Sequence, residues 1–359
     1  MERNNDTMNT EQWTHVNPLP AKTWNHLKVN DASLKWDIDT IQEQELSADE
    51  AWSRTSIGVQ EKTGCGEGLD DVFEGAQVWK AAAAEGEEVC AEIENAETGA
   101  QNTRALLYLE AAENSKLTVW GGFHGEQKQN LALRLVLRAG KNASIRLVQV
   151  LSPGEEGILI NDIGGSCDEG ASVEILHLYL GRGDLFSGCR IELEGSGSKF
   201  SFRTGYLEQH TQRLDVNIVA NHVGTETEST ILADGTLKDQ AYKVFRGTID
   251  FKCGASKSVG NEEENVLLLG DDIVNKTVPL ILCAEEDVQG NHGASIGELD
   301  EDTLFYFAGR GIDRLTAERI LTRGKLERLC AEFGNEKLEE KARQEIEEVL
   351  EDGAEAERI

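Results

Sequence analysis

The sequence predicts a mainly β fold in which the chain winds into a parallel β-helix, and three observations support it. From about residue 104, short runs that alternate apolar and polar residues recur, such as "LALRLVLRA" and "SVEILHLYL". A two-residue period is typical of β-strands. Only Pro153 falls within residues 105–276, which suits an extended sheet because proline lacks the backbone donor of a sheet ladder. Small residues also lead into these runs at a nearly constant interval.

That interval distinguishes a solenoid from a sandwich. It is marked by four serines at steps of 29, 28 and 26 residues, namely Ser115, Ser144, Ser172 and Ser198. A coil that turns and restarts explains such a repeat. A β-sandwich would need closely spaced hairpin turns of the Asn-Gly or Asp-Gly type. Asp234-Gly235 is the one plain instance in the strand region, so the solenoid is the better interpretation.

The regions that flank the repeats have a different composition and are expected to be helical or irregular. Residues 1–103 form the first region, where residues 47–84 are expected to be helical because "VWKAAAAEGEEV" has high helix propensity. Residues 104–297 form the β-helix core, and residues 298–359 form a C-terminal helical region. There Asp300 can cap a helix, and Gly324 is expected to end the next one. A final helix over residues 335–350 has an apolar stripe that can dock on its own body or on a partner.

The composition argues against several classes of partner. The chain has 359 residues and a formal net charge of -31, which repels phosphate backbones and anionic lipid surfaces. We therefore expect no nucleic-acid and no membrane partner. The first 20 residues lack an apolar signal region and no run approaches the ~18 apolar residues of a membrane span, so we expect a cytoplasmic protein. Seven cysteines without a CxxC pair predict neither a disulfide framework nor a zinc ribbon.

Motifs of nucleotide binding and of common catalysis are absent. The sequence contains no P-loop, no GxGxxG after a strand, no HExxH and no GxSxG. An enzyme that acts on polysaccharides is an alternative for a β-helix, but no carboxylate pair stands out among the many acidic residues. His177 follows the alternation of its apolar neighbours and is expected to be a core histidine. His292 lies between small residues that leave its imidazole accessible, and imidazole suits iron, zinc or copper; packing within a turn is the alternative.

Four longer segments resemble a known family. They are "HTQRLDVNIVANHVGTETES", "VFRGTIDF", "ENVLLLGDDIVNKTVP" and "EDVQGNHGASIGELDEDTLFYFAGRGI". Over about residues 210–329 they resemble the SufB/SufD family of iron–sulfur cluster assembly proteins, and "LPAKTWNHL" is similar to the family's entry segment. The resemblance implies a right-handed parallel β-helix with helical ends. It also implies a non-catalytic scaffold in which two SufB/SufD-type subunits pair, while a SufC-type ABC ATPase hydrolyses the ATP.

Two positions identify the chain as a SufD-like member. SufB-like chains carry a cysteine in a "GDKCGAHTVP"-type segment, where this chain has Ile273. SufD-like chains carry a "CSHGA"-type segment, where this chain keeps His292 but has Gly290 at the cysteine position. The resemblance implies a transient iron–sulfur cluster at a subunit interface, with His292 as a ligand and a thiolate from a SufB-like partner. Cys283 is a weaker candidate ligand and is otherwise expected to be a buried strand cysteine. Glu285, Glu286 and Asp287 are further weak candidates, either as oxygen ligands or as acceptors that hold the imidazole ring.

The same resemblance implies that the helical region after Asp300 binds the ATPase. The expected contact residues are Leu304, Phe305, Tyr306, Arg310, Gly311 and Ile312. A purely structural subunit without cluster ligands remains an alternative, and the sequence leaves open whether the chain pairs with itself or with a SufB-like chain.

Overall fold

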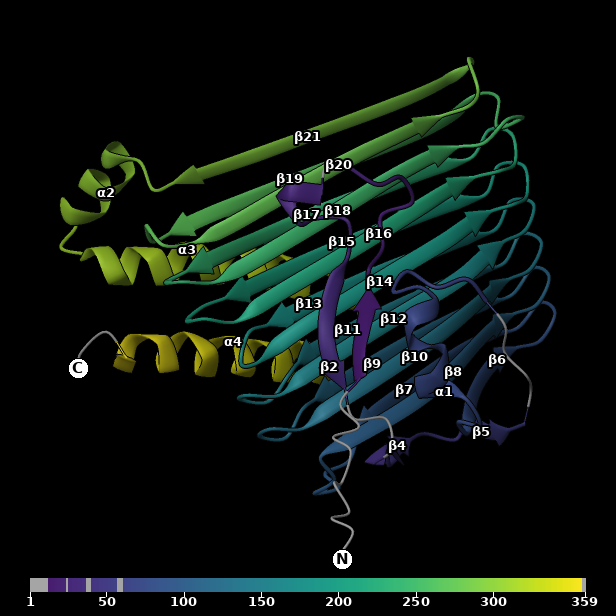
Figure 1. Ribbon diagram of the computed structural model, residues 1–359, viewed down its shortest axis with the longest axis horizontal. Coiled ribbons are helices and arrows are strands. Elements are labelled where there is room, and N and C mark those ends of the chain that lie inside the picture. The colour runs from purple at the N-terminus through teal and green to yellow at the C-terminus, as the bar shows by residue number, and fades with distance from the viewer. Residues whose placement is uncertain (1–11, 24, 37–39, 57–60, 357–359) are drawn as a thin grey trace, which may run out of the picture.

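The chain winds into a flattened β-solenoid, which confirms the predicted β-helix (Figure 1). The computed structural model describes residues 12–23, 25–36, 40–56 and 61–356. From β6 onward, successive strands alternate between two facing sheets, the even-numbered strands in one and the odd-numbered strands in the other; β5 and β3 join the first sheet and β4 the second. Neighbouring strands within each sheet are parallel from β6 onward.

The strands of the solenoid differ little in length. The even-strand sheet contains β6 (Val78–Ala83), β8 (Asn102–Ala111), β10 (Asn130–Ala139), β12 (Ile158–Cys167), β14 (Asp184–Leu193), β16 (Arg213–His222), β18 (Tyr242–Phe251) and β20 (Val274–Cys283). The odd-strand sheet contains β7 (Glu88–Asn95), β9 (Lys116–His124), β11 (Ser144–Ser152), β13 (Ser172–Leu180), β15 (Lys199–Glu208), β17 (Glu228–Lys238), β19 (Ser258–Leu269) and β21 (Val288–Glu298).

The register of the odd-strand sheet explains the serine interval. Lys116, Ser144, Ser172 and Lys199 form one row of register partners across four coils. Two of the predicted serines lie in this row. Ser115 and Ser198 precede it by one residue and still contribute, because their carbonyl oxygens accept the backbone N–H groups of the next coil. The repeat is therefore confirmed, with a shift of one residue at two of its four positions.

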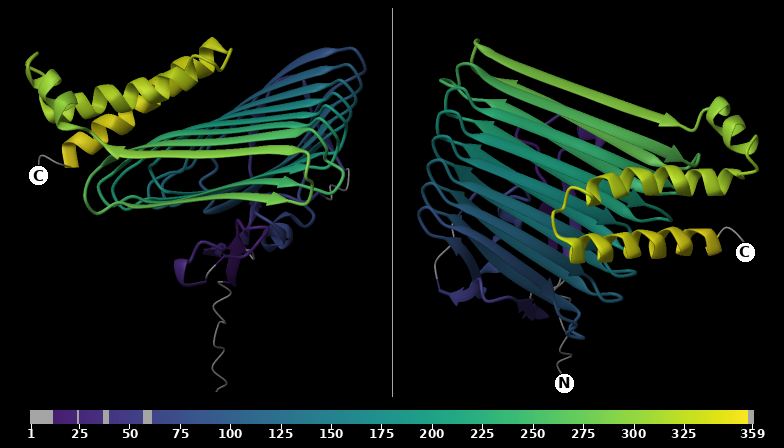
Figure 2. Two further views of the ribbon diagram at one scale, coloured as in Figure 1. Left: turned by 90° about the horizontal axis from the view of Figure 1, so that it is seen from above. Right: turned by 180° about the vertical axis from the view of Figure 1, so that it is seen from behind.

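Alternation along each strand separates an inner from an outer face. Leu131, Leu133, Leu135 and Leu137 of β10 are fully buried in the core between the two sheets. The outer face of the even-strand sheet is buried as well, since the N-terminal segment packs over it. This segment includes the hairpin of β1 (Gln12–Val16) and β2 (Ala32–Trp36), and it lies on the opposite side of the solenoid from the C-terminal helices (Figure 2).

The helix predicted for residues 47–84 is wrong. The described residues of that region contain β4 (Leu46–Ala48), β5 (Trp52–Thr55), β6, a short 3-10 helix (Glu67–Leu69) and the one-turn helix α1 (Asp70–Phe73); the two-residue strand β3 (Gln42–Glu43) precedes it. The alanine-rich stretch is strand β6, which pairs with β5 and β8 while Ala81 and Ala83 face the core. Helix propensity is weak compared with the contacts that a sheet edge and an apolar interior provide. The parallel coils thus begin before residue 104.

The C-terminal region is helical, as predicted, and consists of α2 (Glu301–Ala308), α3 (Arg314–Cys330) and α4 (Glu336–Ala356). The Asp300 side chain caps α2 by accepting the backbone N–H of Thr303 at 2.6 Å, which confirms the predicted cap. Helix α3 does not end at Gly324, as expected, but continues to Cys330. The added turns bury Leu326 and Cys330 against the odd-strand sheet, and this burial outweighs the low helix propensity of one glycine.

The apolar stripe of α4 docks on the chain's own body. Leu338, Ala342, Ile346 and Val349 are buried in a cluster with α3 and with side chains from the outer face of the odd-strand sheet. The sequence left open whether this stripe would meet the same chain or a partner. Within the described part of the chain, no helix is long and apolar enough to cross a membrane.

Candidate functional site

The last coil of the solenoid leaves both sheets open. Strands β20 and β21 terminate their sheets, and among the described residues each has a paired strand on one side only (Figure 1). Most of β20 is half-buried and β21 is almost entirely exposed. A terminal strand presents a row of unpaired backbone N–H and C=O groups that can pair with another strand.

His292 lies on β21 with its side chain on the inner face of this open coil. A Cβ atom at Gly290 would lie 3.1 Å from the Phe251 ring and 3.2 Å from the Ile281 side chain, so Gly290 faces the interior. A Cβ atom at Gly293 would meet nothing within 4 Å. Because side chains two apart on a strand share a face, His292 points inward like Gly290. It is exposed because no further coil covers it.

Cys283 does not lie beside the histidine. The short connection after β20 reverses the chain, and Ile281 lies opposite Gly290. Cys283 and His292 are therefore displaced to opposite sides of that pair, by about 13 Å along the strand direction at ~3.3 Å per residue, and they lie on facing sheets. The expectation that Cys283 is buried is wrong: its strand is the last in its sheet, and its exposed thiol contacts the carbonyl oxygen of Glu285 at 3.0 Å.

The acidic candidates Glu285, Glu286 and Asp287 form the turn before β21. Glu285 accepts the backbone N–H of Gly254 at 2.9 Å, and Asp287 accepts the Ser256 hydroxyl at 2.8 Å. Backbone N–H groups, first that of Gly254, lower the pKa of Glu285. These bonds fasten the last turn to the turn of the preceding coil. Even Asp287 is five residues from the histidine, about 16 Å along an extended strand, so the structure does not bring these acids to it.

The residue that the structure does bring to His292 is Glu262. The two are register partners on adjacent parallel strands. Glu262 is 4% exposed, and its Oε2 atom has no hydrogen-bond partner. The carboxyl group crosses the interior toward Gly247, where a Cβ atom would lie 2.2 Å from Oε1. Burial, and then the charge of Glu264, raises the pKa of Glu262 to about 8.

Sequence reasoning missed Glu262, although a signal was present. In "SVGNEEENV" the alternation of the strand places Glu262 and Glu264 on the face of Ser258 and Gly260, and Glu263 on the other face. An acidic run does not by itself show which of its members face solvent. Which of its members faced the interior depended on strand register, because a shift of one residue exchanges the two faces.

Glu264 belongs to a buried polar cluster below the last coil. It accepts the Tyr206 hydroxyl at 3.0 Å and the Thr277 hydroxyl at 2.6 Å. It also forms an ion pair with Lys243, and both side chains of the pair are buried. Burial lowers the pKa of Lys243, against the effect of Glu264. The Glu264 carboxylate thus has three side-chain partners, whereas Oε2 of Glu262 has no hydrogen-bond partner.

The predicted ATPase-binding residues lie on and after α2, which protrudes beyond the solenoid (Figure 2). Phe305 is 79% exposed and Tyr306 is 55% exposed, while Leu304 is half-buried. The guanidinium carbon of Arg310 lies 3.5 Å from the Tyr306 ring centroid. Gly311 has a φ of 76°, which lets the chain turn from α2 toward α3. Ile312 closes the turn by donating its backbone N–H to Phe307.

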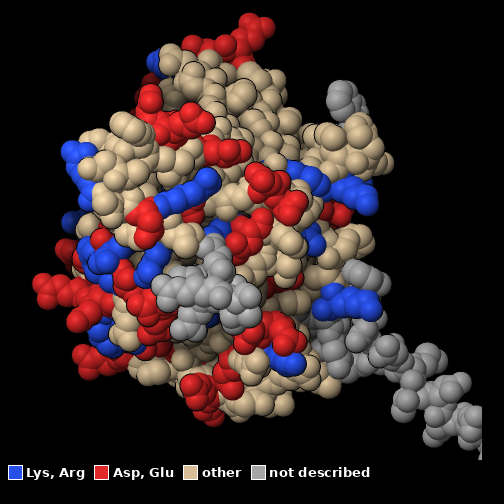
Figure 3. All heavy atoms as spheres, turned by 90° about the vertical axis from the view of Figure 1, so that its left-hand side faces the viewer, with Lys and Arg blue, Asp and Glu red and all other residues tan. Residues whose placement is uncertain are grey.

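The described residues of the helical end carry charges of both signs. Acidic and basic side chains are interspersed there, with uncharged surface between them (Figure 3). Asp234 of β17, for example, pairs with both Lys325 and Arg328 of α3. The exposed aromatic side chains of α2 are therefore the distinctive feature of this end.

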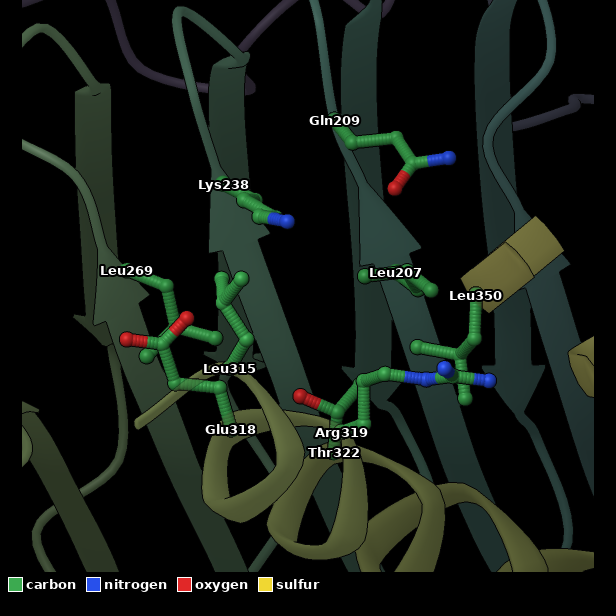
Figure 4. A pocket seen from close by; sticks show the side chains of 9 residues that line it. All are labelled: Leu207, Gln209, Lys238, Leu269, Leu315, Glu318, Arg319, Thr322 and Leu350. Carbon is green, nitrogen blue, oxygen red and sulfur yellow. The ribbon is translucent and has the colours of Figure 1, made fainter. Parts of the chain in front are cut away.

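A narrow pocket lies between α3 and the odd-strand sheet (Figure 4). Its charged lining residues do not converge, since the Glu318 carboxylate and the Arg319 guanidinium extend in different directions (Figure 4). The complete lining is Leu207, Gln209, Lys238, Leu269, Leu315, Glu318, Arg319, Thr322 and Leu350.

The His, Cys, Asp and Glu side chains of the described residues do not gather into a metal site. Across the described ranges, no group of three or more His, Cys, Asp and Glu side chains could hold a metal ion. A histidine at an unpaired sheet edge is instead suited to a site completed by a second subunit. The fold and the site thus define a class of protein: a β-solenoid whose exposed histidine and open sheet edges lie at the same end.

Comparison with known proteins identifies the family within this class. The model of the SUF system FeS cluster assembly family, SufBD core domain, matches residues 92–325. The chain belongs to this family and is a SufD-like member of it.

The curated relatives agree. The chain is 31% identical over 189 residues to the iron–sulfur cluster assembly protein SufD of Bacillus subtilis (strain 168), covering 52% of this chain and 43% of that protein. It is 23% identical over 218 residues to SufD of Escherichia coli (strain K12), with 60% and 51% covered. SufB of Bacillus subtilis (strain 168) is 24% identical over 167 residues, with 46% and 36% covered. The chain thus spans about half the length, or less, of these relatives.

Proposed function

We propose that this chain is the SufD-like subunit of a SUF scaffold complex, in which it pairs with a SufB-like subunit and a SufC-type ATPase to build iron–sulfur clusters for transfer to apo-proteins. The chain itself is a non-catalytic scaffold subunit. The observation that carries the proposal is the place of His292, the histidine of the "GNHGA" segment, on the inner face of the last coil, where each sheet ends in a strand that is paired on one side only.

The open edge is the proposed site of pairing with the SufB-like subunit. The free edges of β20 and β21 can continue into strands of a second solenoid, because unpaired strand edges are satisfied by another strand. Such pairing brings residues of the partner against the imidazole of His292. The partner would supply the thiolate that Gly290 cannot, and the cluster is cargo held between the two chains.

Co-expression tests the assembly. We expect the chain, a SufB-type partner and a SufC-type partner to co-purify as one complex, with its composition given by native mass spectrometry. If only a dimer of this chain forms, the proposed pairing with a SufB-like chain is wrong and the homodimer alternative stands.

The His292→Ala variant tests the ligand. Because the side chain is exposed and faces an open coil, the variant should fold and assemble normally but form no cluster in the reconstituted complex. Cluster yield is read from absorbance and iron content. Asn291→Ala, on the opposite face of the same strand, is the matched control. A normal yield from His292→Ala would leave a purely structural role for this subunit.

The exposed aromatic side chains of α2 are the proposed ATPase contact. Replacing Phe305 and Tyr306 together with alanine should prevent co-purification with a SufC-type protein while the thermal unfolding of this chain stays unchanged. Glu340→Ala, an exposed change on α4, serves as the control. Truncation after Gly297 should have the same effect on binding. Retained binding by either folded variant would place the contact elsewhere.

A further inference from the structure

We propose that Glu262 and His292 together form a nitrogen–oxygen site for a divalent iron ion at the mouth of the solenoid. The inference rests on the proposed function and adds to it which iron species this chain contacts and which second side chain contacts it. One ligand comes from each of the last two strands of the odd-strand sheet.

The register places the two side chains next to each other. Parallel neighbours lie about 4.8 Å apart, and register partners project from the same face. Glu262 faces the interior because its carboxyl group would meet a Cβ atom at Gly247. His292 therefore lies directly above Glu262, on the coil that leaves the solenoid open.

The unpartnered oxygen of Glu262 marks it as the available ligand. Buried polar atoms are nearly always hydrogen-bonded, yet Oε2 of this 4% exposed residue has no partner. The neighbouring carboxylate of Glu264 is already bound by Tyr206, Lys243 and Thr277. A cation between Glu262 and His292 would supply the missing partner.

The neighbours of His292 leave room for this arrangement. The adjacent residues on the same face of β21 are Gly290 and Ala294, which are small. The imidazole can therefore turn toward the preceding coil without meeting a large side chain on its own strand. On the opposite wall, Gly247 leaves space for the carboxyl group.

The donor set determines the species. Thiolates favour iron–sulfur clusters, whereas imidazole and carboxylate ligands suit a single ferrous ion. Gly290 supplies no thiol beside His292, and Cys283 at the end of β20 is displaced from the histidine by about 13 Å along the strand direction. The pair of Glu262 and His292 thus fits an iron ion, whose remaining coordination positions are open to water and to ligands from a partner.

The test uses the purified full chain without partners. Anaerobic titration with Co²⁺, followed by its visible absorption, and with Fe²⁺, followed by equilibrium dialysis, measures binding. We expect Glu262→Gln and His292→Ala each to weaken binding by at least tenfold, about the lower limit for loss of an important metal-site residue. The matched control is Glu263→Gln, whose side chain is exposed on the outer face of the same strand. It should bind like the unmodified chain.

The results separate this inference from the proposed function. Circular dichroism and thermal unfolding first establish that each variant is folded. If the unmodified chain binds neither ion, or if Glu262→Gln binds as tightly as the control, the iron site is overturned, even when His292→Ala abolishes cluster formation in the complex. If both variants lose the ions while His292→Ala still supports normal cluster yield, the iron site stands and the proposed ligand role in assembly fails.

Discussion

The buried histidine of β13 predicts a specific acid sensitivity. His177 is fully buried inside the solenoid, with Nδ1 2.7 Å from the Tyr179 hydroxyl and its ring edge-on to Phe202 at 5.1 Å between centroids. Its Nε2 atom has no partner. Burial lowers the pKa of His177 from 6.5 to about 3. The native state thus keeps this imidazole neutral at a pH where the unfolded chain protonates it.

The direction and size of the effect follow from proton linkage. Above pH 6.5 the histidine is neutral in both states and costs nothing. As the pH falls from 6.5 toward 3, the unfolded state alone gains a proton, so stability is lost at about 1.4 kcal/mol per pH unit. At pH 4.5, two units below the unfolded value, the loss amounts to about 2.7 kcal/mol. His177→Leu should remove this loss, and Tyr179 keeps its bond to Ser187.

The assay compares urea unfolding of the unmodified chain and of His177→Leu at several values between pH 7.5 and pH 4.5. The difference in unfolding free energy should shift by about 2.7 kcal/mol over the acid range in favour of the variant. The many carboxylates of the chain titrate in both proteins and cancel in this difference. Phe202→Leu, a neighbouring core change without a titrating group, should give a constant difference. A constant difference for His177→Leu as well would refute the reasoning.

Three further predictions concern packing and access. Lys243→Met should destabilise the chain by about 3–5 kcal/mol because it leaves Glu264 as a buried unpaired carboxylate; adding Glu264→Gln should restore most of the urea midpoint, and equal midpoints for the single and double variants would contradict the buried pair. Ile346→Ala should cost about 2–5 kcal/mol, since the side chain is fully buried between α4 and its neighbours; an unchanged melting temperature would show that α4 does not dock as described. Cys283 should react with iodoacetamide in the native chain, whereas Cys167, whose thiol pKa is raised by burial, should react only after unfolding. Mass spectrometry of the alkylated peptides gives the order of reaction, and alkylation of Cys167 before Cys283 would contradict the prediction.

Local patterns predicted the repeating part of the fold because each strand and each coil leaves its own mark on a short stretch of sequence. Two-residue alternation identifies a strand, and the serine interval measures the length of a coil. The failure in residues 47–84 has the converse cause. Those alanines have a helical preference in isolation, but they pair with the strands β5 and β8, neither of which is part of the alanine-rich stretch. Tertiary contacts outweigh a propensity of less than about 1 kcal/mol per residue.

At the candidate site, too, the local sequence pattern identified one residue but not its neighbours in space. The "GNHGA" segment identified His292, and the surrounding acidic residues appeared to be its neighbours because they are close in sequence. In an extended strand, however, five residues span about 16 Å, so Asp287 lies far from the histidine and serves the turn instead.

The sequence by itself determined that this chain is a β-solenoid of the SufB/SufD type, that His292 is the residue to examine, and that a helical arm follows the last strand. Only the tertiary structure decided which acidic residue accompanies the histidine. Glu262 and His292 are 30 residues apart, and they are register partners because one complete coil separates them. The length of each coil varies with its turns, so this register depends on how the strands stack and not on any local pattern.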